Sequence, residues 1–439
     1  MVRKKRKLKK KVKIFLIIFL IVLILLSLYL FLPKKKIEKK DNKKDLIADI
    51  LSYNIDKDKD FLTWIKENYK EESLIKLNNY LKENDYNTNI WHNITGNSLI
   101  VLEDLYNKKY DNMTNITINN EKLDNITINF IGDVSLADNW YIAPKYDERG
   151  KKVLGILSEE VVNELTTSTL SIANNEFTIS NRGEKMPGKQ YTFRAKPERL
   201  DIYKEMGIDL VTIANNHVYD FGKNAFLDML DTLDTYKMPH IGAGKNINDA
   251  STPYYFIING YKIAFVNANR SEKNIMTPAA TETEPGVLRC YDPTIFKELI
   301  TKTKKESDYV IALIHWGKED HHELEQVQID TSKEYIDSGA DLIVGTHAHV
   351  LQGIDFYKDK AIIYNIGDFI FNDEDKDTMI YKLTIDNEGV FKHQIIPAHQ
   401  KDEYTYLLHD NEKQKVINNI ISYSDNKINI SSEGEITKK

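Results

Sequence analysis

From about residue 125 the chain alternates short apolar runs with stretches of helical spacing. The apolar runs are bounded by Gly, Asn and Asp and are typical of buried strands. Helical spacing occurs near residues 197–206, 225–236, 293–305 and 326–338. Alternation of this kind predicts an α/β or α+β body with a mainly buried sheet. The pair Asn259-Gly260 predicts a hairpin turn, and residues 378–396, joined at Asp-Asn-Glu-Gly, predict a closing antiparallel pair.

The hydrophobic pattern is different at the N-terminus. Residues 14–32, IFLIIFLIVLILLSLYLFL, are long enough to cross a bilayer core of roughly 30 Å as a helix. The run is followed by PKKKIEKK and not by a small-residue cleavage site, which favours an uncleaved anchor over a signal peptide. Nine Lys and Arg lie between Arg3 and Lys13, and five Lys lie between Lys34 and Lys40. This bias predicts a single-pass protein of the cell membrane, with a cytoplasmic N-terminus and an extracellular main domain.

These patterns divide the 439 residues into five parts. We expect a basic cytoplasmic tail (1–13), a transmembrane anchor (14–32), a small helical stalk or linker (33–124), a main domain (125–399) and a polar C-terminal tail (400–439). The stalk is rich in Lys, Asn, Asp and Glu, so a partly disordered linker is the alternative.

Charge and cysteine content narrow the choice of partners. Beyond residue 40 the chain has 46 Lys and Arg against 65 Asp and Glu, a net charge of about −19. This charge opposes binding to nucleic acid, whereas the basic N-terminal tail suits anionic lipid headgroups. Cys290 is the single cysteine, so neither an intrachain disulfide nor a zinc site built from cysteines is possible.

Polar residues follow five of the predicted strands directly. In an extended segment residues i and i+2 project to the same side, so His347 and His349 are expected to reach one point in space. In open α/β sheets the ligand site lies beyond the carboxyl ends of the strands. Each residue alone has an ordinary explanation as a turn, a cap or a core histidine, but the set indicates a metal site. The set is Asp133, Asn174-Asn175-Glu176, Asn215-Asn216-His217, His315, and His347 with His349.

The donor types narrow the choice of ion. Carboxylate oxygens, imidazole nitrogens and an Asn carbonyl suit divalent Mn, Fe or Zn better than Ca or Mg. The donors are more numerous than one ion requires. Two ions roughly 3.5–4 Å apart, bridged by a carboxylate, would use the whole set and would activate a water for attack on a phosphorus ester.

The chain resembles the CapA family of poly-γ-glutamate capsule synthesis, whose domain belongs with the calcineurin-like metallophosphoesterases. The resemblance covers residues 126 to about 397 and rests on GDVSLA, ANNE, YTFRAKPERLDIYKEMGIDLVTIANNHVYDFG, ALIHWGKE, SGADLIVGTHAHVLQGID and IIYNIGDFIF. It implies a metallophosphoesterase-like four-layer α/β/β/α sandwich, preceded by the anchor and the helical segment. It also implies six metal ligands: Asp133, Glu176 as the bridging carboxylate, Asn216, His315, His347 and His349.

The resemblance also implies roles around the metals. His217 would face the substrate and protonate a leaving oxygen, and Asp220 and Glu319 would orient imidazoles. Arg194 would contact an anionic group of the substrate.

Two departures from the family pattern bear on activity. Metallophosphoesterases typically begin with Asp-x-His, but Ser135 stands in the place of that histidine. The usual Gly-Asn-Phe is here Gly367-Asp368-Phe369, and Asn175 replaces a usual Leu. The serine weakens the inference from phosphoesterase fold to phosphoesterase turnover.

The favoured hypothesis is a membrane-anchored protein with a metal-dependent phosphoesterase-type site. It would serve the synthesis, export or anchoring of an anionic capsule polymer, poly-γ-glutamate, together with that polymer or its synthase complex. Two alternatives stay open: a non-catalytic module that binds the polymer or the synthase, and a general surface phosphatase or nucleotidase.

Overall fold

The computed structural model describes residues 115–439 except 120–122, 260, 272–275, 387 and 425–426. The predicted basic tail, the anchor and nearly all of the stalk lie outside the described residues. Within the described part of the chain, no helix combines the length and the apolar character that a membrane span requires.

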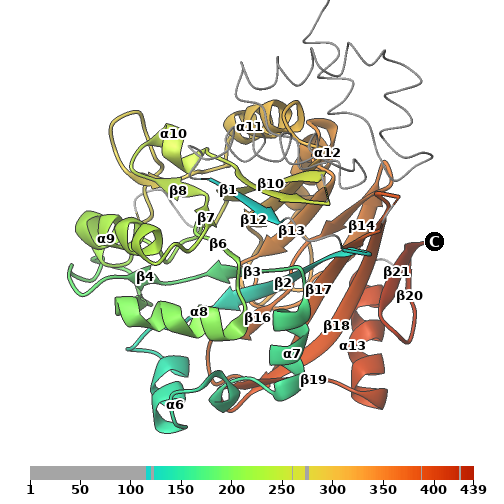
Figure 1. The fold of residues 1–439 in the computed structure, drawn as a ribbon, viewed down its shortest axis with the longest axis horizontal. Coiled ribbons are helices and arrows are strands. Elements are labelled where there is room, and N and C mark those ends of the chain that lie inside the picture. Colours follow the sequence, from blue (N-terminus) through green and yellow to red (C-terminus); the bar gives the residue numbers. More distant parts are fainter. Residues whose placement is uncertain (1–114, 120–122, 260, 272–275, 387, 425–426) are drawn as a thin grey trace, which may run out of the picture. The chain divides into compact units, whose positions relative to one another are not determined.

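Two large β-sheets pack face to face in the described part of the chain (Figure 1). The first has seven strands, in the order β1 (Ile116–Asn119), β9 (Tyr254–Ile258), β10 (Tyr261–Asn269), β12 (Tyr309–His315), β13 (Leu342–Thr346), β15 (Lys360–Ile363) and β14 (Ile354–Tyr357). The pairs β10–β12, β12–β13 and β13–β15 are parallel.

The second sheet has ten strands. Eight lie in the order β20 (Ile428–Ile430), β21 (Glu435–Lys438), β18 (Phe391–Lys401), β17 (Lys376–Ile385), β2 (Ile126–Val134), β3 (Leu170–Asn175), β6 (Leu210–Thr212) and β7 (His240–Ile241). In addition β16 (Asp368–Ile370) pairs with β2, and β19 (Tyr404–Leu407) pairs with β18. Strands β16, β2, β3, β6 and β7 are parallel to one another, whereas β17 runs antiparallel to β2.

Short elements complete the connections. They are the two-stranded ribbons β4 (Thr178–Ile179) with β5 (Arg194–Ala195) and β8 (Ala243–Gly244) with β11 (Gly286–Val287), and the 3-10 turns η1 (Val153–Gly155) and η2 (Pro197–Arg199).

Helices cover the outer face of each sheet. Apolar residues of β2, β3 and β6 share one buried cluster with four helices: α6 (Ile142–Glu148), α7 (Glu159–Thr167), α8 (Leu200–Met206) and α9 (Gly222–Thr235). A separate cluster joins β10, β12 and β13 to three others: α10 (Ile247–Ala250), α11 (Thr294–Lys304) and α12 (Gln326–Asp337). The layers are therefore helix, sheet, sheet and helix, and the predicted mixed α/β class is confirmed.

The C-terminal segment differs from the polar tail that the sequence predicts. Residues 404–438 form β19, α13 (Asp410–Tyr423), β20 and β21. Val416, Ile417 and Ile420 are spaced so that they lie on one face of α13, and they are buried in the core between the sheets. The surrounding Asn, Lys and Glu occupy the other face. They make the segment polar in overall composition, and this is why the sequence predicts a polar tail.

The two predicted antiparallel pairs are present. Strands β9 and β10 pair around Asn259, whose φ of 50° fits a tight hairpin turn. Strands β17 and β18 pair over ten residues on each strand, from Lys376 opposite Gln400 to Ile385 opposite Phe391.

His393 of β18 gives the fold a predictable pH dependence. Burial, helped by the charge of Lys360, lowers the pKa of His393 from 6.5 to about 4. Its Nδ1 lies 2.6 Å from the hydroxyl of buried Tyr381, which donates to the neutral ring. Between pH 6.5 and 4 the unfolded chain binds a proton that the folded chain excludes, so stability falls as the pH is lowered through this window.

Between pH 7 and pH 4 we expect the free energy of unfolding to fall by about 3 kcal/mol less in His393→Gln than in the wild type. Urea unfolding of both proteins at both pH values measures this difference. The contributions of the other titrating groups are the same in the two proteins and therefore cancel. Equal losses in the two proteins would contradict it.

Candidate metal centre

Four strands, β3, β6, β12 and β13, carry apolar side chains on the face toward the other sheet, and this face becomes polar at their carboxyl ends. The side chains that fill the core between the sheets include Ile172, Leu210, Leu313 and Val344. Side chains alternate along a strand, so the residue two positions later lies on the same face. Those residues are Asn174, Thr212, His315 and Thr346. The two sheets thus enclose an apolar core that ends in a polar cluster.

Asp133 reaches this cluster because β2 is irregular next to it. The β2–β3 register shifts between Ile131 and Asp133. Ile131 and Val134 both face the helices, which regular alternation would not allow. The irregularity therefore turns Asp133 toward the other sheet. Gly132 is required here, because a Cβ at this position would lie 1.7 Å from the carbonyl oxygen of Gly367.

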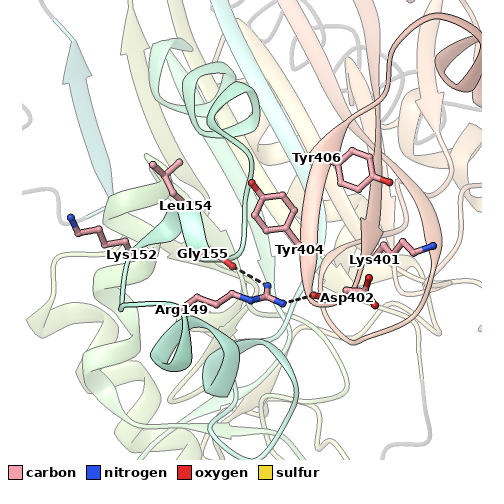
Figure 2. Close-up of a pocket in the computed structure, with 8 residues that line it drawn as sticks. All are labelled: Arg149, Lys152, Leu154, Gly155, Lys401, Asp402, Tyr404 and Tyr406. Atoms are coloured by element: carbon pink, nitrogen blue, oxygen red, sulfur yellow. Dashed lines mark hydrogen bonds between the residues drawn. The ribbon is translucent and has the colours of Figure 1, made fainter.

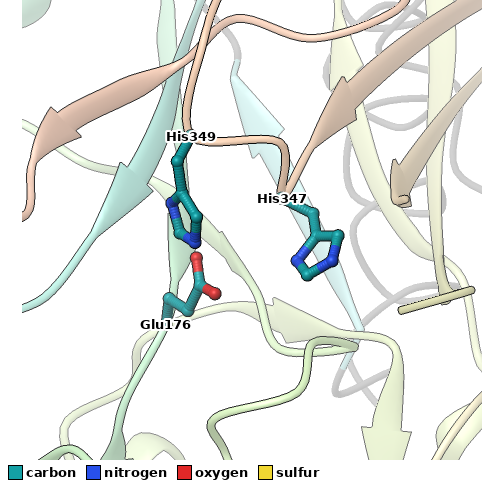
Figure 3. A group of neighbouring side chains, drawn as sticks. All are labelled: Glu176, His347 and His349. Carbon is teal, nitrogen blue, oxygen red and sulfur yellow. The ribbon is translucent and has the colours of Figure 1, made fainter. Parts of the chain in front are cut away.

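His347 and His349 lie just beyond β13 and not within an extended strand, so the predicted reason for their proximity is wrong. Their φ angles are 97° and 57°, in the left-handed region that side chains other than glycine seldom adopt. The turn nevertheless brings both rings to Glu176, and the donor atoms of the three residues lie within 4.8 Å of one another (Figure 3). Residues in such strained conformations are found preferentially at functional sites.

The first group of donors surrounds the carboxylate of Glu176. His315 Nε2 lies 2.7 Å from Asn216 Oδ1 and 3.4 Å from Glu176 Oε1. The ring of His347 packs against that of His315 with their centroids 4.5 Å apart. Four predicted ligands, Glu176, Asn216, His315 and His347, therefore surround one position.

The second group lies on the other side of Glu176. Asp133 Oδ2 accepts a hydrogen bond from the main-chain N–H of His347 at 3.0 Å and lies 3.3 Å from His349 Nδ1. The same nitrogen lies 2.7 Å from Asp368 Oδ1. The donor atoms of Asp133, His349 and Asp368 lie within 4.8 Å of one another, as do those of Asp133, Glu176 and His315.

Burial and mutual charge determine the protonation of this cluster. Burial and the nearby Asp133 carboxylate raise the pKa of Glu176 well above its usual value. Burial lowers the pKa values of His315 and His347 well below the usual value, so both rings are neutral and have lone pairs to give. Burial alone would also lower the pKa of His349, but the charges of Asp368 and Asp133 raise it.

Asn174 belongs to the predicted strand-end set, but the sequence did not indicate what it contacts. Its Nδ2 lies 2.6 Å from Asp133 Oδ1, and it also donates to Glu176 Oε2 at 3.3 Å. Its Oδ1 accepts from Thr212 and Asn215 at 3.0 and 3.1 Å. Asn174 therefore fixes the two carboxylates relative to each other. Its place two residues after Ile172, on the same face of β3, is the sequence signal that it lies in the cluster.

His217 lies at the edge of the cluster in a chain of buried groups. Its Nδ1 donates to Asp220 Oδ2 at 2.8 Å, and its Nε2 lies 3.9 Å from Glu176 Oε1. Asp220 Oδ1 pairs with Lys189 Nζ at 2.8 Å, and the same ammonium group donates to the carbonyl of Asn216. Asp220 thus occupies the orienting position that the resemblance implies, and Lys189 is an addition that no sequence pattern indicated.

Two predicted residues lie less close to the cluster. The Arg194 guanidinium lies 4.3 Å from the centre of the Phe221 ring and donates to the carbonyls of Arg182 and Gly183. Among the described contacts none joins Arg194 to the cluster. Glu319 is exposed, and its Oε1 lies 3.9 Å from His347 Nε2.

The donors fit a divalent cation. Glu176 Oε1 and His347 Nδ1 are buried, and neither has a hydrogen-bond partner among the described residues. Buried polar atoms are normally paired, and leaving them unpaired costs free energy. A cation of the Mn, Fe or Zn type would satisfy both atoms and would offset the repulsion between the Glu176 and Asp133 carboxylates.

A separate hollow of about 590 Å³ lies away from these residues (Figure 2). It is lined in part by Arg149, whose guanidinium donates to the carbonyls of Gly155 and Asp402. No residue of the cluster lines it. The hollow is therefore separate from the candidate metal centre.

Removal of Lys189 tests the buried chain behind His217. Lys189→Met leaves the carboxylate of Asp220, which is inaccessible to solvent, without its ammonium partner. We expect a loss of about 3 kcal/mol in the free energy of unfolding. Lys185→Met, at an exposed position of the same loop, is the control and should unfold like the wild type in urea. Equal stability of the two variants would contradict this account.

Comparisons with known proteins agree with the motifs. The family model for bacterial capsule synthesis protein PGA_cap matches residues 127–373. The PGA biosynthesis protein CapA of Bacillus subtilis (strain 168) is 27% identical over 280 residues, which are 62% of this chain and 71% of that protein. The capsule biosynthesis protein CapA of Bacillus anthracis is 30% identical over 216 residues, 48% of this chain and 52% of that protein.

Among solved structures, a putative 5'-nucleotidase from Staphylococcus aureus has a TM-score of 0.42 and 13% identity over 68% of this chain and 58% of that chain. The PGA_cap match spans over half of the 439 residues and includes every predicted metal ligand. The chain belongs to the PGA_cap family of bacterial capsule synthesis proteins.

Proposed function

We propose that this chain is a metal-dependent phosphoesterase-type protein that acts in the synthesis, export or anchoring of poly-γ-glutamate. The observation that carries the proposal is the convergence of six potential ligands at the seam between two sheets, with two buried donor atoms left unpaired. The layer order of helix, sheet, sheet and helix agrees with a metallophosphoesterase-like sandwich. The names of the two CapA relatives support the link to the capsule polymer.

The residues of the centre have separable tasks. Divalent ions in such a centre supply Lewis acidity toward a phosphorus ester and its attacking water. Asp133, Glu176, Asn216 and the three histidines would hold them. His217 would pass a proton from Nε2 to the leaving oxygen while Asp220 holds the proton on Nδ1.

The proposed partner and location rest on the sequence and on the names of relatives. The predicted anchor at residues 14–32 would place the metal centre outside the cell, next to an exported polymer. A relative from Mycobacterium tuberculosis is named a probable polyglutamine synthesis accessory protein, which supports a role beside a synthase complex. The acidic domain would repel a polyglutamate chain everywhere except at a cationic centre.

A second candidate function is a metal-holding module without turnover. Ser135 favours it, because a hydroxyl stands where metallophosphoesterases typically supply a histidine. In that case the centre would bind the polymer or a synthase subunit through its cations.

Glu176→Gln tests the metal centre. The substitution removes the carboxylate that both donor groups share, so we expect the affinity for Mn²⁺ to fall by at least about 10- to 100-fold. Elemental analysis and calorimetric titration of the purified full chain in detergent measure this change. The control is Glu323→Gln, which removes an exposed carboxylate. A wild type that binds no transition metal, or a Glu176→Gln chain that binds it normally, would rule out the centre.

His217→Asn separates catalysis from binding. His217 is not among the proposed ligands, so the metal content should be unchanged, while hydrolysis of a chromogenic phosphodiester should fall about 100-fold. In a strain that lacks the wild-type chain, His217→Asn should fail to restore the mass of surface polymer. Full restoration by this variant, or a wild type that holds metal and hydrolyses no ester, would favour the binding module.

A further inference from the structure

Asp368 brings an additional carboxylate into the cluster. It is the first residue of β16, which runs parallel to β2 with Asp368 in register with Asp133. Only 1% of its surface is exposed. Its Oδ1 lies 2.7 Å from His349 Nδ1, which also lies 3.3 Å from Asp133 Oδ2. Three donors from three segments therefore meet at one point.

We propose that Asp368, Asp133 and His349 directly ligate a second cation, beside the position formed by Glu176, Asn216, His315 and His347. This proposal rests on the proposed function and identifies a ligand that the family pattern does not supply. Glu176 lies within 4.8 Å of members of both groups and would be the carboxylate shared by the two cations.

The described residues do not balance the charge at this point. Asp368 Oδ2 is buried and accepts no hydrogen bond among them. The nearest ammonium, Lys376 Nζ, is 4.0 Å away and also pairs with Glu374 and with Asp320, the latter at 3.0 Å. Asp133 and Glu176 add two more buried carboxylates, and only His349 lies between them as a compensating group. A divalent cation would neutralise this excess.

Ser135 explains why the second cation would need a carboxylate ligand from another strand. It lies two residues after Asp133, it is buried, and its hydroxyl has no partner among the described residues. A neutral serine hydroxyl is a weak ligand beside an imidazole. Asp368 provides the missing strong donor from β16.

The two positions differ in donor chemistry. The first has two imidazoles, an amide oxygen and a carboxylate, which suits Zn or Fe. The second has carboxylates from Asp133 and Asp368 and one imidazole, and oxygen-rich sets favour Mn²⁺. Mn²⁺ is therefore the appropriate probe for the second position.

The competing role for Asp368 is positioning. A carboxylate that accepts from one nitrogen of a metal-binding histidine orients that ring without touching the ion. Asp368→Asn separates the two roles. The amide oxygen still accepts a hydrogen bond from His349 Nδ1, but the charge and the strong ligand are lost.

The test is the Mn²⁺ stoichiometry of the full chain, purified in detergent, stripped of metal and reloaded. Elemental analysis should give two Mn²⁺ per wild-type chain and one per Asp368→Asn chain. Electron paramagnetic resonance should show a spin-coupled pair in the wild type and an isolated ion in the variant. Asp320→Asn, which also contacts Lys376 but is exposed, should keep two ions.

Two ions in Asp368→Asn would overturn the proposal in favour of positioning. One ion in both wild type and variant would also overturn it and leave the proposed function intact. A wild type without any metal would instead reject the proposed function itself. Circular dichroism verifies that each variant folds. If Asp368→Asn does not fold, Asp368→Ser replaces it, with the same expected loss of one ion.

Discussion

The hydrogen bond from the His347 main-chain N–H to Asp133 Oδ2 joins the carboxyl ends of two different sheets. Asp133 belongs to β2 of the ten-stranded sheet, and His347 follows β13 of the seven-stranded sheet. All the other donors are arranged around this contact. A shift between the sheets would separate the carboxylates from the imidazoles. The packing of the apolar core between the sheets therefore sets the geometry of the polar cluster.

Burial gives this cluster its chemical character. Asp133, Glu176 and His315 are inaccessible to solvent, so each charge or lone pair interacts with its neighbours in a medium of low polarity. The same burial that raises the pKa of Glu176 keeps His315 neutral. Carboxylates that repel one another and the neutral imidazoles of His315 and His347 together suit a divalent cation. Lys189 and Asp220 extend this network behind His217.

Much of the site was predictable, because strand ends are visible in the sequence. The fold brings together four of the candidate ligands at which apolar runs of the sequence end: Asp133, Glu176, Asn216 and His315. Asp368 also follows an apolar run. It was noted only because the family usually has asparagine there, and its place at a strand end was not used.

Other features depend on tertiary contacts that no local pattern encodes. Lys189 reaches Asp220 from a loop between β4 and β5, and the turn at His347 is left-handed although its neighbours favour a strand. The helix α13 was missed because three apolar side chains are enough to bury one face of an otherwise polar segment.

The left-handed backbone at His347 and His349 has a consequence for the stability of the fold. Glycine adopts such angles without steric penalty, so the polypeptide would be more relaxed with glycine at either position. Glycine at position 349 would, however, remove the imidazole that lies between the buried Asp133 and Asp368 carboxylates. Selection for heat resistance alone is therefore expected to retain His349, because the unpaired carboxylates would cost more free energy than the relaxed turn would gain.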